Sequence, residues 1–179
     1  LLEVEAAAYG QVRVLEGVPV QGVGTVLRLA HTEIVGGERF TVYKRRLRLE
    51  TLCAELAEDG FRPPTSDEWE YACSGGARAL WRWGDQLGPP LGPDGKSPLS
   101  RPNAFGLRIA FDSYESELCG PPPVWRGGDG GSSVCGGEGL LAWQIVLASA
   151  YHEPDQEGPD GFDSPNVRRA FPLPPDCLD

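Results

Sequence analysis

The segment at residues 62–76, RPPTSDEWEYACSGG, constrains the fold more than any other part of the chain. Pro63 and Pro64 keep its approach extended, because the residue before a proline avoids the helical region. Thr65 and Glu68 then stand three residues apart, which is the spacing of a capping box. In that motif each side chain bonds the backbone N–H of the other residue, so the pattern predicts a helix that begins just after Thr65.

The rest of this segment predicts which side of the helix faces the core and where the helix ends. Trp69, Ala72 and Cys73 recur at three- and four-residue spacing, so they share one face. Gly75 and Gly76 follow them and are typical of a helix end. Because capping, the helix dipole and termination account for the polar residues, we expect this segment to be structural rather than catalytic.

Two further elements are predicted before this helix. The β-rich runs within residues 24–46 meet at Gly36 and Gly37, which is typical of a hairpin. Residues 46–60 then carry an apolar stripe at helical spacing and a stop at Gly60, which predicts an amphipathic helix. The stripe consists of Leu49, Leu52, Cys53, Leu56 and Ala57.

The second half of the chain predicts short strands among long loops. Residues 84–138 are rich in Gly, Pro, Ser, Asp and Asn, which indicates either a functional surface or a loop packed by its own aromatic residues. Residues 140–151 are apolar enough for a buried strand or strand pair, and residues 167–173 are predicted as a last strand. Together these elements predict one α+β domain over residues 1–179, with a hairpin region at residues 1–46 and much irregular coil.

The charge balance excludes several kinds of partner. The net charge is −10 and the sequence pI is about 4.7, so we expect neither nucleic acid nor a membrane as a partner. The basic run at residues 43–49 is predicted to be a solvated face. No apolar run reaches the roughly 18 residues that cross a bilayer. We therefore expect a soluble, cytoplasmic protein; a removed leader is the open alternative, because the chain starts at Leu1 and has no Met.

Most other conspicuous residues have a structural interpretation. Trp81 and Trp83 are expected to pack the long coil, and Asp85 to fix a turn. The five cysteines include no CxxC pair, which argues against a zinc knuckle and favours reduced thiols. They are Cys53, Cys73, Cys119, Cys135 and Cys177.

The order of these motifs resembles that of the formylglycine-generating-enzyme family, also called the sulfatase-modifying-factor family, whose fold is a variant of the C-type lectin fold. The family hallmark is an Arg-Leu-Pro-Thr segment that runs into Glu-Trp-Glu-Tyr-Ala-Ala and Gly-Gly. The residues that the resemblance marks as structural are Thr65, Glu68, Trp69 and Tyr71. The other matching segments are TLCAELAEDGF (51–61), LWRWGDQ (80–86), PNAFGLRIAF (102–111) and VWRGGD (124–129), so the hallmark region covers about residues 47–130.

The resemblance also implies which chemistry to test. Oxygen-using members hold copper(I) between two cysteines five residues apart, and Cys135, three residues after Ser132, resembles the first of them. Leu140 stands where the second cysteine is expected, so copper is not an expected cofactor. The iron-dependent sulfoxide synthases of this fold need three histidines, whereas this chain has only His31 and His152.

Two functional hypotheses follow. In the first, the chain is a non-catalytic domain that binds a protein or small ligand through its glycine-rich segments, 112–138 and 150–166, as in bacterial variable proteins of diversity-generating retroelements or toxin-immunity relatives. The predicted ligand-binding residues are Trp125, Arg126, Asp129, Trp143, Tyr151 and His152. In the second, it is a copper- or thiol-dependent oxidase that acts through Cys135 and Ser132, with Arg126 as the nearest positive charge in sequence.

A calcium site is a weaker hypothesis. Asp155, Glu157 and Asp160 form an acidic loop, and hard cations prefer clusters of oxygen ligands. Their spacing fits no EF-hand loop, although relatives of this fold do bind structural calcium. We therefore predict no cofactor firmly; calcium is the cofactor that the sequence favours over copper.

Overall fold

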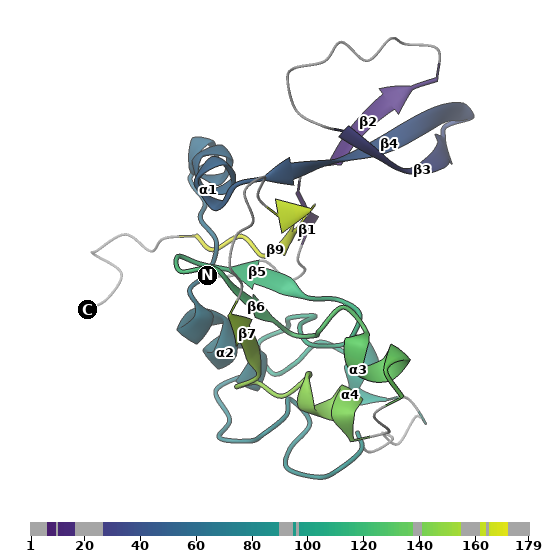
Figure 1. The fold of residues 1–179 in the computed structure, drawn as a ribbon. Helices are drawn as coiled ribbons and strands as arrows, with labels where there is room; N and C mark the ends of the chain where they lie inside the picture. The colour runs from purple at the N-terminus through teal and green to yellow at the C-terminus, as the bar shows by residue number, and fades with distance from the viewer. Residues whose placement is uncertain are drawn as a thin grey trace.

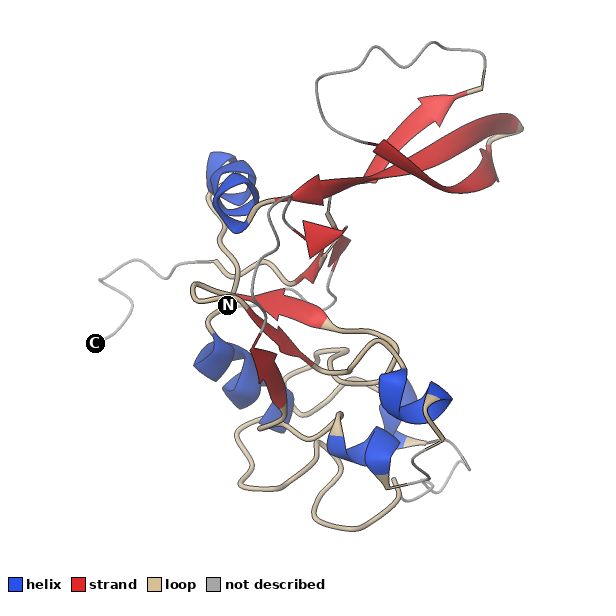
Figure 2. Ribbon diagram, in the orientation of Figure 1, coloured by secondary structure: helices blue, strands red, loops and turns tan. Residues whose placement is uncertain are grey.

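A computed structural model describes residues 7–9, 11–16, 27–89, 95, 97–137, 141–154, 162–163 and 165–171 of the chain. Within these ranges the protein is a mixed α+β structure, as predicted, with much irregular coil (Figure 1, Figure 2). The helices are α1 (Leu49–Glu58), α2 (Ser66–Ser74), α3 (Ser132–Cys135) and α4 (Ala142–Ile145), with a 3-10 turn at Pro98–Ser100. The strands are β1 (Ala7–Ala8), β2 (Gln11–Leu15), β3 (Leu27–Val35), β4 (Glu38–Leu47), β5 (Glu117–Cys119), β6 (Val124–Arg126), β7 (His152–Pro154), β8 (Phe162–Asp163) and β9 (Asn166–Val167). None of the described helices has the length and apolarity that crossing a bilayer requires.

The strands form two sheets. In the body of the molecule the strand order is β1-β9-β5-β6-β7, with β5 and β9 parallel and the other pairs antiparallel. Strands β2, β4 and β3 form a second antiparallel sheet, here called the arm, which projects away from the body (Figure 1). The last residues of β4 leave the arm and pair with β8, where Leu47 lies opposite Phe162.

The arm contains the predicted hairpin. β3 and β4 pair from Leu27 to Val35 and are joined at Gly36 and Gly37, which have φ values of 61° and 86°. Positive φ at both central residues matches the right-handed twist of the two strands, and glycine adopts it without steric cost. The hairpin prediction is therefore confirmed.

Helix α1 is also confirmed, although it spans Leu49–Glu58 within the predicted segment 46–60, whose first residues end strand β4. Leu49, Leu52 and Leu56 are buried, and Cys53 packs partly against the same cluster. Ala57, at the edge of the predicted stripe, is exposed instead. The buried stripe is therefore narrower than the sequence pattern.

Helix α2 has the predicted capping box. The N–H of Glu68 donates to Oγ1 of Thr65 at 3.2 Å, and the N–H of Thr65 donates to the Glu68 carboxylate at 2.8 Å. Gly75 ends the helix in the left-handed region, with φ 62°. Trp69 and Cys73 are fully buried, as their shared face predicts.

The body is packed around two clusters of buried side chains. One lies under α2, and there Trp81 stacks on Trp83 at 5.6 Å between ring centroids, so their predicted packing role is confirmed. Its buried members are Trp69, Ala72, Cys73, Trp81, Leu107, Ile109, Ala110, Cys119, Val146 and Leu147. The other lies under α1 and consists of Leu47, Leu49, Leu52, Leu56, Leu118, Phe162 and Val167.

A buried ion pair joins β5 to the residue after β9. Arg168, which is fully buried, donates to both carboxylate oxygens of Glu117, at 2.8 and 3.1 Å. The indole N–H of Trp69 donates to the same carboxylate at 2.9 Å. One acid therefore ties the sheet to helix α2.

Two strand predictions need correction. The prediction of a buried strand at residues 140–151 is wrong, because residues 142–145 form the helical turn α4. The indole N–H of Trp81 donates to the carbonyl of Gln144 at 2.6 Å, and the Gln144 side chain accepts from the N–H of Gly88, so the turn is fixed by the preceding loop. The last predicted strand is shorter than expected: β9 ends at Val167, and Ala170 forms only an isolated bridge with Arg62.

Candidate functional site

The glycine-rich segment after β6 lies tightly against residues 113–115. A Cβ added at Gly128 would lie 2.6 Å from the carbonyl oxygen of Ser113, and one at Gly127 would lie 2.9 Å from the Trp69 ring. The carbonyl of Ser113 accepts from the N–H groups of Asp129 and Gly131, at 3.1 and 3.2 Å. Glycine is needed at Gly128 because backbone approaches backbone there, and at Gly127 because the Trp69 ring lies against it.

Asp129 fixes the start of helix α3. Its carboxylate accepts from the N–H of Gly131 at 2.9 Å and from the N–H of Ser133 at 2.7 Å. The sequence suggested Asp129 as a ligand-binding residue, whereas the structure gives its carboxylate backbone partners within the loop.

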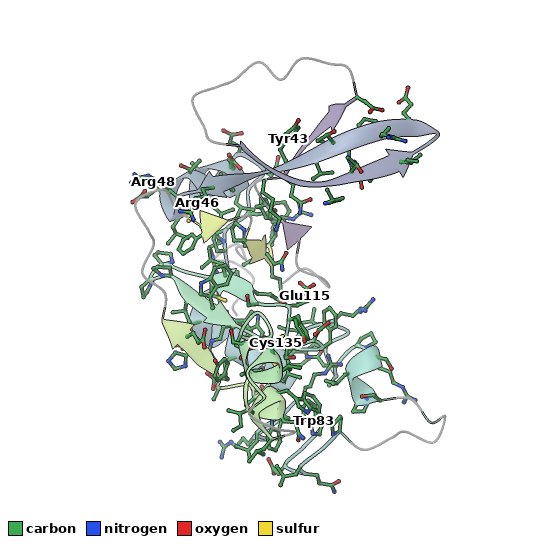
Figure 3. The ribbon with its side chains drawn as sticks, turned by 45° about the vertical axis from the view of Figure 1, so that its right-hand side comes forward. Tyr43, Arg46, Arg48, Trp83, Glu115 and Cys135 are labelled. Atoms are coloured by element: carbon green, nitrogen blue, oxygen red, sulfur yellow. The ribbon has the colours of Figure 1, made fainter. Side chains whose placement is uncertain are left out.

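Cys135 lies exposed at the end of α3 (Figure 3). The Tyr114 hydroxyl lies 3.5 Å from the Cys135 sulfur, and this contact raises the pKa of Tyr114 above its ordinary value. A Cβ at Gly131 would lie 2.2 Å from the Tyr114 ring, so the ring rests directly on the loop backbone. Ser132, the other residue of the oxidase hypothesis, begins α3 and is exposed.

Large apolar side chains are exposed around this loop. Tyr114 touches α3, and α3 contacts α4, the two short helices lying side by side (Figure 1). The exposed fractions are 52% for Tyr114, 42% for Val134, 51% for Leu141 and 48% for Ile145. We call these four residues the α3–α4 surface. Apolar side chains gathered in this way are typical of a surface that meets a partner.

Arg126, another predicted ligand-binding residue, points into the protein. Its side chain is 3% exposed, and its guanidinium donates to the carbonyls of Ser149 and Tyr151 at 3.0 and 3.2 Å. It also donates to the Ser66 hydroxyl and reaches the Glu70 carboxylate at 3.2 Å. Arg126 therefore holds strand β6, the start of α2 and the 149–151 segment together.

The other predicted ligand-binding residues lie in different environments. Trp125 is half-buried and packs edge-to-face on Phe162, with 5.7 Å between centroids, and Trp143 packs partly against the α2 cluster. Tyr151 donates its hydroxyl to Glu153, and burial raises its pKa. His152 is exposed on β7, which pairs with β6 and so lies beside Trp125 and Arg126.

The described thiols differ sharply in exposure. Cys73 and Cys119 are fully buried in the α2 cluster, and burial raises the pKa of Cys73 to about 12. Cys53 lies on α1 in the other cluster, and burial raises its pKa too. Neither fully buried thiol reaches the surface on which Cys135 lies. Cys177 and Leu140 fall outside the described residues.

The predicted calcium ligands Asp155, Glu157 and Asp160 also fall outside the described residues. Across the residues that are described, His, Cys, Asp and Glu side chains form no group of three or more that would hold a metal ion.

Sequence reasoning did not find Tyr114 or Ile145. Tyr114 stands 21 residues before Cys135, and only the fold brings the two together. Ile145 lies in the segment predicted as a buried strand, so its exposure had no signal in the pattern.

Comparisons with known proteins add no family assignment: no protein-family model matches the chain, and no curated protein matches it.

Proposed function

We propose that this chain is a divergent, non-catalytic member of the formylglycine-generating-enzyme family, with its C-type-lectin-like fold, and that it binds a protein partner. The order of the elements supports this. A helix at 49–58, the capped helix α2, the packed Trp81–Trp83 turn and strand β6 follow one another as the family motifs do. The Asn103 side chain, within the Asn-x-Phe-Gly-Leu motif, bonds both the end of α2 and the backbone of Leu107.

The observation that carries the binding proposal is the α3–α4 surface. Val134 stands on a loop whose course is fixed by Asp129, Ser113 and the close-packed glycines, and Tyr114 packs on that loop. Leu141 and Ile145 are exposed on the neighbouring turn α4. A rigid loop that displays apolar residues loses little conformational freedom on association. The four side chains are uncharged, which favours an apolar contact on the partner.

Partner capture from an extract of the native host tests this proposal. Tagged wild-type protein is compared with Val134→Asp and Ile145→Asp, which place a charge in the proposed contact, and with Ile34→Asp at the tip of the arm. Ile34 is 68% exposed, so its substitution is a matched apolar-to-acid control. We expect one partner to be retained by wild type and Ile34→Asp and lost by the other two variants. Equal retention by all four proteins, or no partner at all, would contradict the proposal.

The alternative is a copper- or thiol-dependent oxidase that acts through Cys135. One observation favours it: the thiol is exposed and has a hydroxyl, from Tyr114, 3.5 Å from its sulfur. Metal analysis of the purified protein distinguishes the two proposals. Stoichiometric copper that is lost in Cys135→Ser would support the oxidase, whereas unchanged partner binding by that variant supports the binding proposal.

A further inference from the structure

A second site lies where helix α2 meets the segment after β9. A cavity of about 490 Å³ opens there. Its floor consists of the buried apolar residues Ala72, Leu107 and Ala170. Neither functional hypothesis uses these residues.

Three exposed aromatic side chains surround the cavity. Tyr71, Phe105 and Phe171 line it and are 64%, 47% and 47% exposed. Exposure of three large rings to water is unfavourable, and a bound apolar group would remove part of their surface from water. The sequence assigned Tyr71 a structural role, yet its ring stands mostly in solvent.

Two pairs of rings hold these aromatics in place before any ligand arrives. Tyr71 and Phe105 lie 5.5 Å apart with their planes tilted by 43°, and Phe171 packs edge-to-face on Phe61 at 5.7 Å. The backbone N–H of Phe105 donates to the Asn103 side chain, which itself bonds the end of α2. The rings are therefore largely pre-organised, which lowers the entropic cost of binding.

The polar wall of the cavity carries two charges that compensate each other. The Arg62 guanidinium donates to both carboxylate oxygens of Glu68, at 2.7 and 2.6 Å. The same carboxylate accepts from the N–H of Thr65, and Arg62 also donates to the carbonyl of Pro63. A charged ligand would lose hydration here without gaining an uncompensated counter-charge.

We propose that this cavity binds an uncharged small molecule that carries an aromatic ring. The ring would pack among Tyr71, Phe105 and Phe171, where aromatic contacts add to the gain from apolar burial. The volume lies in the range of small-molecule sites, which favours such a ligand over a protein segment. The charges of Arg62 and Glu68 compensate each other, so this wall favours an uncharged ligand over a charged one. This site shares no residue with the α3–α4 surface, so each of the two proposals can be tested without the other.

Titration with indole tests the site, with indole-3-acetate and tryptamine as charged comparators of similar shape. Amide resonances of the full-length chain report which residues respond. We expect saturable shifts by indole around Tyr71, Phe105 and Ala170, and affinities for both charged compounds that are several-fold weaker. Removal of one ring, in Tyr71→Ala or Phe171→Ala, should weaken indole binding by about five-fold. Tyr114→Ala, which removes a ring of comparable exposure from the α3–α4 surface, should leave indole binding unchanged.

Three results would overturn the proposal. The first is the absence of saturable shifts, and the second is binding that Tyr71→Ala and Phe171→Ala leave intact. The third is self-association of the chain, detected by sedimentation, that Phe171→Ala abolishes, because the rings would then cover a second copy of the chain. If Val134→Asp loses partner capture but still binds indole, the aromatic site is independent of the α3–α4 surface.

Discussion

Arg168 is a fully buried cation whose compensating charge comes from Glu117. In Glu117→Ala the guanidinium stays buried without its carboxylate, and the Trp69 indole N–H loses its acceptor. We expect the free energy of unfolding to fall by about 3–5 kcal/mol, the usual cost of an uncompensated buried charge. Urea denaturation followed by tryptophan fluorescence measures the change.

The exposed pair between Arg13 and Glu33 on the arm is the matched control. Glu33→Ala removes a carboxylate from an arginine there too, but water solvates the remaining charge, so a loss of at most about 1 kcal/mol is expected. Similar losses in the two variants would show that burial does not set the strength of the Glu117–Arg168 pair.

Gly131 and Gly130 are neighbours in the chain with different surroundings. Both have positive φ, 84° and 67°, but a Cβ at Gly131 would meet the Tyr114 ring, whereas one at Gly130 meets nothing within 4 Å. Both alanine variants incur the backbone cost of about 1 kcal/mol, and Gly131→Ala adds overpacking of about 1–3 kcal/mol. Unfolding free energies and the Tyr114 ring resonances measure both effects. If Gly130→Ala moves the ring as much, the ring does not rest on the loop backbone.

At the scale of the element, helix α2 depends on the ionised form of Glu68. The side-chain bond from Arg62 is the main cause that lowers the pKa of Glu68 from 4.5 to about 2. A lowered pKa in the folded state means that the unfolded chain binds the proton first as pH falls. The stabilisation is therefore complete above about pH 5 and is lost between pH 5 and pH 2.

Denaturation midpoints of wild type and Glu68→Gln between pH 7 and pH 2 measure this dependence. We expect the two proteins to differ most at neutral pH and to converge toward pH 2. Asp67→Asn, on the same turn of α2, controls for the loss of a neighbouring acid. A constant difference between wild type and Glu68→Gln across the pH range would contradict the role of the ionised carboxylate.

Elements set by local rules were predictable, and elements set by distant partners were not. The capping box, the Gly36-Gly37 hairpin and the α1 stripe each depend on residues within a few positions. Helix α4 depends on Trp81, which lies 63 residues before Gln144 along the chain. An apolar run alone does not distinguish a buried strand from a turn held in this way.

At the scale of the whole molecule, the candidate site shows the same division. Cys135 stood out as a thiol among glycines, but its tyrosine neighbour comes from a separate loop. Arg126 stood out as an arginine before two glycines, which does not reveal that its guanidinium bonds two backbone carbonyls inside the fold. The sequence therefore identified Cys135 and Arg126 as notable residues but did not show which groups their side chains contact.

The arm and the body should differ in stability, because the arm has little buried apolar surface among its described side chains. Val42 is buried there, whereas Ile34 and Val35 near the turn are exposed, and β4 joins the body through its short pairing with β8. Segments with few buried contacts open locally, below the free energy of global unfolding. We expect amide hydrogen exchange by mass spectrometry to be much faster in peptides from β3 and β4 than in peptides from β5 and β6.

Val42→Ala sharpens this prediction, because it removes apolar volume from the arm alone. It should speed exchange in β3 and β4 and leave global unfolding nearly unchanged, whereas Leu118→Ala in the body should lower global stability by about 2–5 kcal/mol. If Val42→Ala instead lowers global stability as much as Leu118→Ala does, the arm and the body unfold as one cooperative unit. The arm would then be part of the folding core, and its projection from the body would not imply independent opening.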